Sequence, residues 1–155
     1  MEQGKFIYWL AYILTITILI YIIGRVFPRK WIKEEKFPFY SFGFEKNGKI
    51  YNKIKVKNWK TKYPDASKIM HKIFPKIPEK KLDEKTPEKI YILIKESCVA
   101  ETTHIISIIL GFLGLLFWKS IYCVILTLLY AIFQIPAIII QRYNRPRLMK
   151  IFKQS

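Results

Sequence analysis

Three uncharged apolar stretches constrain the fold of this chain more than any other sequence feature. They cover residues 6–24, 102–118 and 120–141 and contain 19, 17 and 22 residues. An α-helix rises about 1.5 Å per residue, so about 20 residues cross a hydrocarbon core roughly 30 Å thick. The sequence therefore predicts an all-α integral membrane protein with about three hydrophobic spans, one near the N-terminus and two in a C-terminal helical hairpin.

We expect these spans to belong to a single membrane domain, residues 1–155. Its predicted parts are a first span at 6–24, a basic and aromatic cytoplasmic region at 25–101, a membrane hairpin at 102–141 and a basic cytoplasmic tail at 142–155. Residues 102–118 are marginal in length, so a shallow or re-entrant hairpin is an alternative to full spanning. A signal peptide is the alternative to an uncleaved anchor at 6–24, but no small-x-small cleavage site precedes Arg25.

The positive charge is concentrated beside the spans. The chain has 27 basic and 11 acidic residues and a formal net charge of +16. Lys5 alone precedes the first span, whereas five basic residues follow it within 25–36 and five more lie in 142–155. The positive-inside rule then places the N-terminus outside and the C-terminus in the cytoplasm.

The region 25–101 combines lysines with interleaved aromatic residues. It carries 20 of the basic and 10 of the acidic residues. Aromatic rings beside basic grooves raise the question of RNA binding, because bases stack on such rings. We favour contact with an anionic leaflet, with aromatic rings at headgroup depth and lysines on lipid phosphates. The expected partners are therefore membrane lipids and not nucleic acid, while the oligomeric state is left open.

Local signals in this region predict a turn and two helices. Asn47-Gly48 between residues 39–44 and 49–54 favours a small β-hairpin, with an interfacial helix over 49–62 as the alternative. A short amphipathic helix is predicted after Pro64. Further on, Thr86-Pro87-Glu88 supplies a hydroxyl cap, a proline in the first turn and a carboxylate at the positive dipole end. One helix is thus expected to run from Pro87 into the second span.

The candidate catalytic residues lie where that helix enters the membrane. Glu101 and His104 are three residues apart and are therefore neighbours on one helix face, and Glu96 fits on the same broad face. Ionisable groups at bilayer depth are expensive unless they serve a function or have a partner. A carboxylate beside an imidazole is typical of a general base, which is one interpretation. The other is that these side chains only stabilise the helix at the interface. The cluster has too few ligands for a metal site.

The C-terminal octapeptide at 141–148 reads Gln-Arg-Tyr-Asn-Arg-Pro-Arg-Leu. Guanidinium groups bind phosphate and carboxylate in a bidentate manner, so the pattern predicts recognition of an anionic group at the bilayer edge. Pro146 is expected to end the helix there. The two cysteines, Cys98 and Cys123, have no zinc spacing and are expected to be small buried residues.

Three segments of the chain resemble a known family. The first is Ser-Phe-Gly-Phe-Glu-Lys-Asn-Gly-Lys at 41–49, continuing to Asn58-Trp59-Lys60. The second is Glu96 with Ala100-Glu101 and His104, which follows the pattern Glu-x-x-Arg-Ala-Glu-x-x-His-Trp. The third is Tyr130-Ala131 and Pro136, ending in the octapeptide. Over roughly residues 31–148 the chain resembles the glycosyl-4,4'-diaponeurosporenoate acyltransferases, bacterial membrane proteins of staphyloxanthin-type carotenoid biosynthesis.

The resemblance implies transfer of a fatty acyl group to a sugar hydroxyl of a membrane glycolipid in the bacterial cell membrane. Acyl-CoA is the expected donor and co-substrate, and no other cofactor and no metal is expected. The expected catalytic residues are His104, Glu101 and Glu96, and the expected substrate-binding residues are Arg142, Tyr143, Asn144, Arg145, Arg147, Gln134 and Trp59. Val99, Ile105 and Gln134 stand where the family has arginine, tryptophan and asparagine, so a different sugar lipid is the alternative acceptor.

Two other functions compete with acyl transfer. A non-catalytic membrane adaptor or assembly subunit would use Glu101 and His104 as polar contacts between spans. A small membrane transferase of another group, such as methyl, would use the arginines for a different anionic cofactor. Turnover of His104 and Glu101 variants distinguishes an acyltransferase from an adaptor. The mass added to the lipid distinguishes acyl transfer from transfer of another group.

Overall fold

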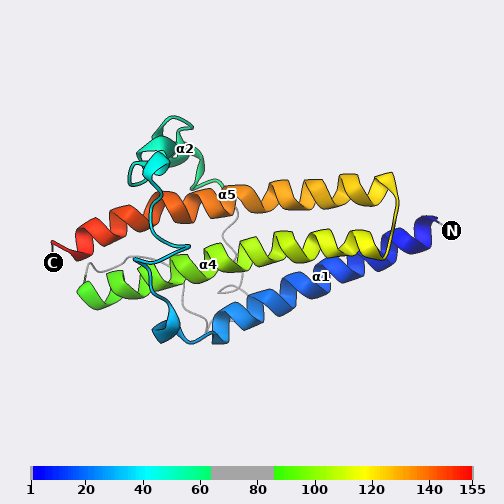
Figure 1. Ribbon diagram of the computed structural model, residues 1–155, viewed down its shortest axis with the longest axis horizontal. Helices are drawn as coiled ribbons and strands as arrows, with labels where there is room; N and C mark the ends of the chain where they lie inside the picture. Colours follow the sequence, from blue (N-terminus) through cyan, green and yellow to red (C-terminus); the bar gives the residue numbers. More distant parts are fainter. Residues whose placement is uncertain (1, 64–85, 155) are drawn as a thin grey trace. The chain divides into compact units, whose positions relative to one another are not determined.

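The computed structural model describes residues 2–63 and 86–154, and Figure 1 shows that long helices dominate these parts of the chain. The long helices are α1 (Glu2–Val26), α4 (Pro87–Leu113) and α5 (Ile121–Phe152). The short elements are α2 (Val56–Trp59) and the 3-10 helices η1 (Arg29–Trp31), η2 (Gly43–Glu45), η3 (Lys49–Asn52) and η4 (Gly114–Leu116). No strand occurs within the described residues. The amphipathic helix predicted after Pro64 lies outside them.

Three helices are long and apolar enough to cross a membrane, as predicted. The candidate spans are Gly4–Val26, Pro87–Leu116 and Ile121–Phe152, with 23, 30 and 32 residues. Most of their apolar surface is exposed, for example Leu14, Ile18 and Phe133. A stable protein exposes this much contiguous apolar surface only where lipid or a partner covers it. The fold is therefore that of an all-α membrane protein.

The predicted start of the long helix is confirmed. The Thr86 hydroxyl accepts a hydrogen bond from the Lys89 amide at 3.4 Å, and the Thr86 carbonyl accepts one from the Ile90 amide at 3.0 Å. Proline costs nothing in the first turn, because its missing N–H would have no helical partner there. From Pro87 the helix continues to Leu113, and α5 begins at Ile121 after the expected break near 118–120.

The chain divides into two compact units, and both α4 and α5 contribute to each. Unit 1 comprises residues 1–31 and 99–138, which include α1, the C-terminal half of α4 and the N-terminal half of α5. Apolar residues recur on one face of α1, because positions three or four apart share a face. The core of unit 1 contains Trp9, Ile13, Ile16, Ile20, Trp118 and Cys123.

Polar side chains join the helices of unit 1 at two levels. The Tyr12 hydroxyl donates to the Leu110 carbonyl at 2.7 Å, and the Thr17 and Tyr130 hydroxyls lie 3.0 Å apart. Close packing accompanies these bonds: a methyl group added at Gly111 would lie 2.9 Å from a Tyr130 ring carbon. Small residues and interhelical hydrogen bonds are the usual means of helix association in lipid, where burial of apolar surface gives little.

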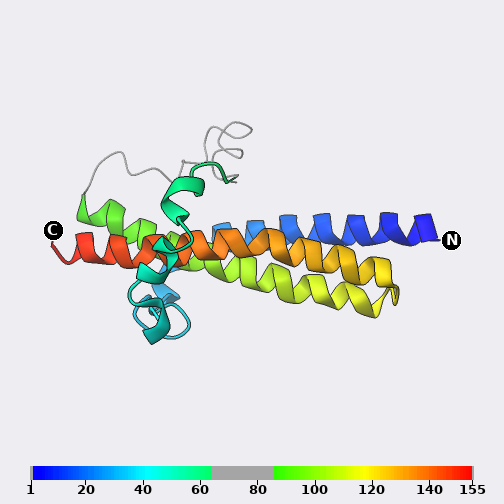
Figure 2. The ribbon, with the colours of Figure 1, turned by 90° about the horizontal axis from the view of Figure 1, so that it is seen from above.

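Unit 2 comprises residues 32–98 and 139–155. In Figures 1 and 2 the short turns of residues 32–63 lie beside the C-terminal part of α5. Val56, Ile90, Ile94 and Cys98 are fully or almost fully buried here. Lys95 is also buried and pairs with the Glu34 carboxylate, while its ammonium donates to the Ile32 carbonyl at 2.5 Å. The connection after α1 is thus attached to α4 by a paired charge.

The predicted β-hairpin at 39–54 does not form. Lys46, Asn47 and Gly48 all have positive φ values, of 48°, 54° and 79°. A two-residue hairpin turn takes two left-handed residues, whereas three in succession redirect the chain, and its flanks become η2 and η3. The alternative helix over 49–62 is present only in pieces, because Lys55 also has a positive φ between η3 and α2.

The prediction that Pro146 ends the last helix is wrong. Helix α5 passes through Pro136 and Pro146 and ends at Phe152. Proline removes one helical N–H donor, so the carbonyl four residues earlier loses its helical partner. For Pro146 that carbonyl belongs to Arg142, and Gly48 packs against it: a methyl group at Gly48 would lie 3.5 Å from the Arg142 oxygen and 3.6 Å from the Pro146 ring. The absence of a side chain at Gly48 lets residue 48 approach this turn of α5 closely.

This contact makes Gly48 sensitive to substitution. Gly48→Ala adds a methyl group to a left-handed residue and places it 3.3 Å from an Arg147 nitrogen. We expect a loss of about 1–2 kcal/mol of unfolding free energy, measured as a lower melting temperature in detergent. Gly43→Ala is the matched control, because Gly43 has open space around it. Equal melting temperatures of the two variants would contradict the packing of Gly48 on α5.

Candidate active-site residues

His104 and Gln134 form a polar pair between two helices of unit 1. His104 lies on α4, Gln134 lies on α5, and the histidine Nδ1 is 2.6 Å from the glutamine Oε1. An amide oxygen only accepts hydrogen bonds, so Nδ1 carries the proton and donates it. The second ring nitrogen, Nε2, is then the basic one. Both side chains are half-buried. The structure thus brings together a predicted catalytic residue and a predicted substrate-binding residue, with Gln134 fixing the tautomer.

Glu101 is fully buried one helical turn before His104. Their spacing of three residues puts both on one face of α4. Thr127 on α5 is also fully buried, and Ser107 on α4 is nearly so. These otherwise apolar helices thus contain a carboxyl group, an imidazole and several hydroxyl or amide groups. Such a set can move a proton, because a base with a fixed tautomer lies beside a carboxylate on the same helix face.

Glu96 belongs to unit 2, since the division of α4 falls after Cys98. Its side chain is half-buried. The role predicted for it beside Glu101 and His104 stays a prediction. Within the described residues, no group of three His, Cys, Asp or Glu side chains is placed to hold a metal ion. Cys98 and Cys123 are both completely buried, which confirms the interpretation of both as small core residues.

Arg142 binds two groups of the segment 32–63. Its Nη1 donates to Glu45 Oε1 at 2.9 Å and its Nη2 donates to the Pro38 carbonyl at 2.8 Å. The guanidinium also lies 4.7 Å from the centre of the Phe42 ring. A guanidinium that binds a carboxylate, a carbonyl and an aromatic face together fixes the position of the segment that supplies them.

Glu45, the partner of Arg142, is buried and accepts further hydrogen bonds. Glu45 is 2% exposed and accepts hydrogen bonds from the Tyr51 hydroxyl and from the Phe42 amide at 2.8 Å. Burial alone would raise the pKa of Glu45, but the hydrogen bonds from Tyr51, Arg142 and the Phe42 amide outweigh it and lower that pKa. Glu45 is therefore ionised in the fold. Sequence reasoning missed this residue, although it lies inside the Phe-Glu-Lys-Asn-Gly segment used for the family resemblance.

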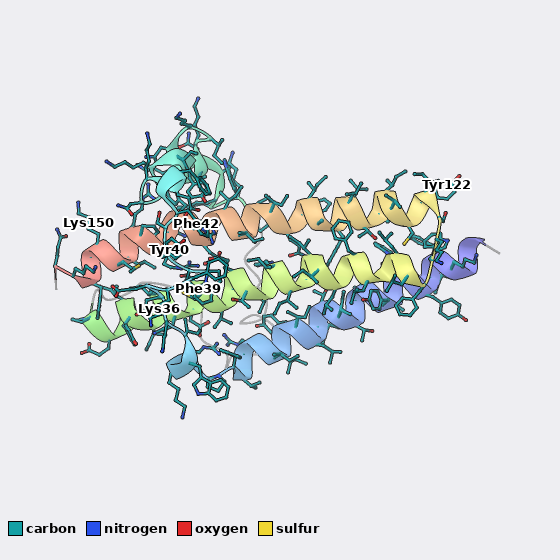
Figure 3. All side chains as sticks on the ribbon, in the orientation of Figure 1. Lys36, Phe39, Tyr40, Phe42, Tyr122 and Lys150 are labelled. Atoms are coloured by element: carbon teal, nitrogen blue, oxygen red, sulfur yellow. The ribbon has the colours of Figure 1, made fainter. Side chains whose placement is uncertain are left out.

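Arg145 is 2% exposed and bonds to two chain segments. Its Nε and Nη2 donate to the hydroxyl and carbonyl of Ser97 at 2.9 and 3.2 Å, and its Nη1 donates to the Phe39 carbonyl at 2.8 Å. Figure 3 shows Phe39, Tyr40 and Phe42 gathered beside α5. Both Arg142 and Arg145 thus hold the segment 32–63 in place. The sequence analysis did not predict this role for the two arginines.

The remaining predicted tail residues gather around one ring. Tyr143 is 5% exposed, with the Arg147 guanidinium 3.5 Å and the Lys60 ammonium 4.9 Å from its ring centre. Lys60 donates to Asn144 Oδ1 at 2.8 Å, and Arg147 donates to Asn52 Oδ1 at 3.0 Å and to the Tyr143 carbonyl. Lys60 and Asn52 were not predicted as site residues.

Trp59, the last predicted residue, closes a local turn. Its indole Nε1 donates to the Ile54 carbonyl at 3.0 Å, and the side chain is half-buried at the end of α2. Its neighbour Lys60 donates a hydrogen bond to Asn144 on α5. A binding role for Trp59 itself stays a prediction.

Comparison with known proteins gives consistent matches over nearly the whole chain. Residues 28–154 match the family described as Glycosyl-4,4'-diaponeurosporenoate acyltransferase. A protein of that name from Staphylococcus aureus strain MRSA252 is 36% identical over 149 residues, which cover 94% of this chain and 84% of the relative. The protein of the same name from Staphylococcus aureus strain bovine RF122 / ET3-1 is 35% identical with the same coverage. No solved structure matches this chain significantly.

The Glu45–Arg142 pair should make stability depend on pH. Because folding lowers the pKa of Glu45, its stabilisation is fully present above the ordinary value of 4.5 and is lost as the pH falls through the lower folded value. Glu45→Gln should cost about 2 kcal/mol near neutral pH and remove this part of the acid sensitivity. Unfolding free energy measured between pH 3 and pH 7 in detergent checks the prediction.

Glu35→Gln is the matched control, because Glu35 is exposed and its contact with Lys153 is 3.5 Å long. An exposed pair contributes little, so this variant should resemble the wild type. If Glu45→Gln and Glu35→Gln had the same pH profile, the pair would not carry the stabilisation.

Proposed function

The chain belongs to the glycosyl-4,4'-diaponeurosporenoate acyltransferase family, and from this premise we propose that it transfers a fatty acyl group to a sugar hydroxyl of a membrane glycolipid. It is an acyltransferase by family, with three helices able to cross a membrane. The names of its relatives support a glycosylated carotenoid acid as the acceptor. Another sugar lipid is the alternative acceptor, since Val99, Ile105 and Gln134 differ from the family pattern.

The observation that carries the catalytic part of this proposal is the bond between His104 and Gln134. A sugar hydroxyl is a poor nucleophile at neutral pH and needs a base. With Nδ1 donating to Gln134, His104 offers Nε2 as that base. The Glu101 carboxylate, buried on the same helix face, stabilises the imidazolium that forms. Glu96 is proposed as an accessory acidic residue of the same helix.

The proposed reaction is a direct transfer without an acyl-enzyme. His104 Nε2 takes the proton of the sugar hydroxyl while the sugar oxygen attacks the thioester carbonyl of the donor. The tetrahedral intermediate collapses as its carbon–sulfur bond breaks, and the new ester remains on the sugar. The imidazolium then returns its proton to the departing thiolate, which leaves as a thiol. Histidine is thus regenerated in its starting tautomer, and atoms and protons balance over the cycle.

We propose acyl-CoA as the donor, with no further cofactor. The excess of basic residues after α1 and in the tail supports an N-terminus outside and a C-terminus in the cytoplasm, where acyl-CoA is found. The interleaved lysines and aromatic residues of 25–101 support contact with lipids rather than with nucleic acid. The guanidinium groups of Arg142 and Arg145 are occupied by the chain itself, so their part in donor binding is to position the surrounding segment.

A structural role for the polar pair is the second candidate. Hydrogen bonds between helices hold membrane proteins together, and the His104–Gln134 bond joins α4 to α5. A non-catalytic adaptor would need the pair for this reason alone. The Thr17–Tyr130 pair offers an internal comparison, because it also joins two helices of unit 1 but contains no base.

Turnover of purified variants given acyl-CoA and glycolipid separates the two roles. His104→Ala should lower kcat by about 10²–10⁴-fold, because general-base catalysis is worth that much, and Glu101→Gln should lower it less. Tyr130→Phe is the matched control and should leave kcat near the wild-type value. Each protein is first shown to be folded by its melting temperature.

Unchanged turnover in both His104→Ala and Glu101→Gln would refute the catalytic assignment. Equal losses of melting temperature and turnover in His104→Ala and Tyr130→Phe would favour the structural role instead.

The chemical group that is transferred can be read from cellular lipids. Mass spectrometry of lipids from cells with and without the gene should show glycolipids that are heavier by a fatty acyl group when the gene is present. A gain of only a methyl group would assign the chain to another class of transferase. The identity of the heavier lipid also reports the acceptor.

A further inference from the structure

Two positive charges of unit 2 converge on the ring of Tyr143. The Arg147 guanidinium carbon lies 3.5 Å and the Lys60 ammonium 4.9 Å from the ring centre. The two cations come from segments that are far apart in the sequence, one after α2 and the other on α5. Like charges repel, so a fold that gathers them on one side chain needs a compensating interaction.

Two other cations of this unit obtain that compensation from carboxylates. Lys95 pairs with Glu34, and Arg142 pairs with Glu45. Within residues 2–63 and 86–154, no carboxylate forms an ion pair with Lys60 or Arg147. Their hydrogen-bond partners there are neutral: Asn144 for Lys60, and Asn52 with the Tyr143 carbonyl for Arg147. Among the described residues, Lys95 and Arg142 are thus paired with carboxylates, whereas Lys60 and Arg147 share one ring and have only neutral hydrogen-bond partners.

We propose that Lys60 and Arg147 together bind a phosphate group at the ring of Tyr143. The chain uses one N–H of Nη1 and one of Nη2 of Arg147, so three of its five N–H groups remain for phosphate oxygens, and the ammonium of Lys60 adds a compact charge. Asn52 and Asn144 hold the two cations by their side-chain oxygens. Both cations are half-buried, so they are oriented and still reachable. Anion recognition was predicted for the whole basic tail. The proposed site limits it to Arg147 of the tail and to Lys60, which lies outside the tail.

The electrostatics around Lys60 agree with this assignment. Burial lowers the pKa of Lys60, and the charges of Arg147 and Lys57 lower it further. A bound phosphate would oppose this effect, because an anion stabilises the protonated ammonium.

Phosphate chemistry could reach this site from two sources. One is the acyl donor: acyl-CoA carries a pyrophosphate and a ribose phosphate, and this identification rests on the proposed function. The other is the headgroup of an anionic lipid in the cytoplasmic leaflet. Binding of acyl-CoA would hold the donor by its phosphates. Binding of a lipid headgroup would fix unit 2 to the membrane surface. The chemistry of the site is the same in both cases.

Binding measurements on the full chain in neutral detergent test the site. The probes are coenzyme A, inorganic pyrophosphate and short-chain phosphatidylglycerol, with phosphatidylcholine of equal chain length as the neutral comparison. The variants are Lys60→Gln and Arg147→Gln, and each should weaken anion binding by about tenfold or more, because each removes a charged hydrogen-bond donor. Arg147→Lys keeps the charge and the fold but loses the bidentate geometry, and should show an intermediate loss.

Lys53→Gln is the matched control. Lys53 is exposed in the same segment, so its variant loses one charge without touching the site and should bind like the wild type. Tighter binding of coenzyme A than of phosphatidylglycerol would identify the donor as the source, and the reverse order would identify the lipid. Either result supports the site.

Equal binding by the wild type, Lys60→Gln and Arg147→Gln would overturn the proposal, as would wild-type protein that binds none of the three anions. His104→Ala keeps this failure distinct from that of the proposed function. That variant should bind the anions normally while turnover is lost, whereas failure of the acyl-transfer proposal would leave turnover unchanged in it.

Discussion

The pairing of Glu45 with Arg142 is the interaction on which the second unit depends. Residues 32–63 contain no long helix, so their conformation cannot rest on backbone ladders and must come from contacts with α4 and α5. Glu45 and Arg142 supply a nearly buried ion pair, and Arg145 adds three bonds to Ser97 and Phe39. Removing one partner of such a set would leave a charge or a carbonyl without compensation, which is why the pieces depend on one another.

The partners of the basic side chains differ between the cations that hold the fold and those proposed to bind an anion. Lys95 and Arg142 have carboxylate partners, and Arg145 is surrounded by oxygens of the chain. Lys60 and Arg147, by contrast, share an aromatic ring and two asparagines. In unit 1 His104 Nδ1 lies 2.6 Å from the Gln134 amide oxygen, and this contact orients the imidazole. A transferase needs both kinds of group: a base for the acceptor and a cationic site for an anionic donor.

Several features were predictable because they depend on local sequence. The three spans follow from the absence of charge over a length that crosses a bilayer, and the start of α4 follows from Thr86 and Pro87. The break near 118–120 and the burial of both cysteines were also predicted correctly. His104 and Gln134 were both selected, although their contact was not, since it joins residues 30 positions apart.

The sequence by itself determined where the apolar helices lie and which family the motifs resemble, because hydrophobicity and motif spacing act over short distances. Tertiary structure decided what the charges of the octapeptide do. Pro146 lies inside α5 with Gly48 close to its ring, and Asn47-Gly48 makes no hairpin because a third left-handed residue joins them. Arg142, Arg145 and Arg147 look equivalent in the octapeptide. Their roles differ only through partners about 50 to 100 positions away. Those partners make Arg142 and Arg145 hold the fold, whereas Arg147, with Lys60, is proposed to bind an anion.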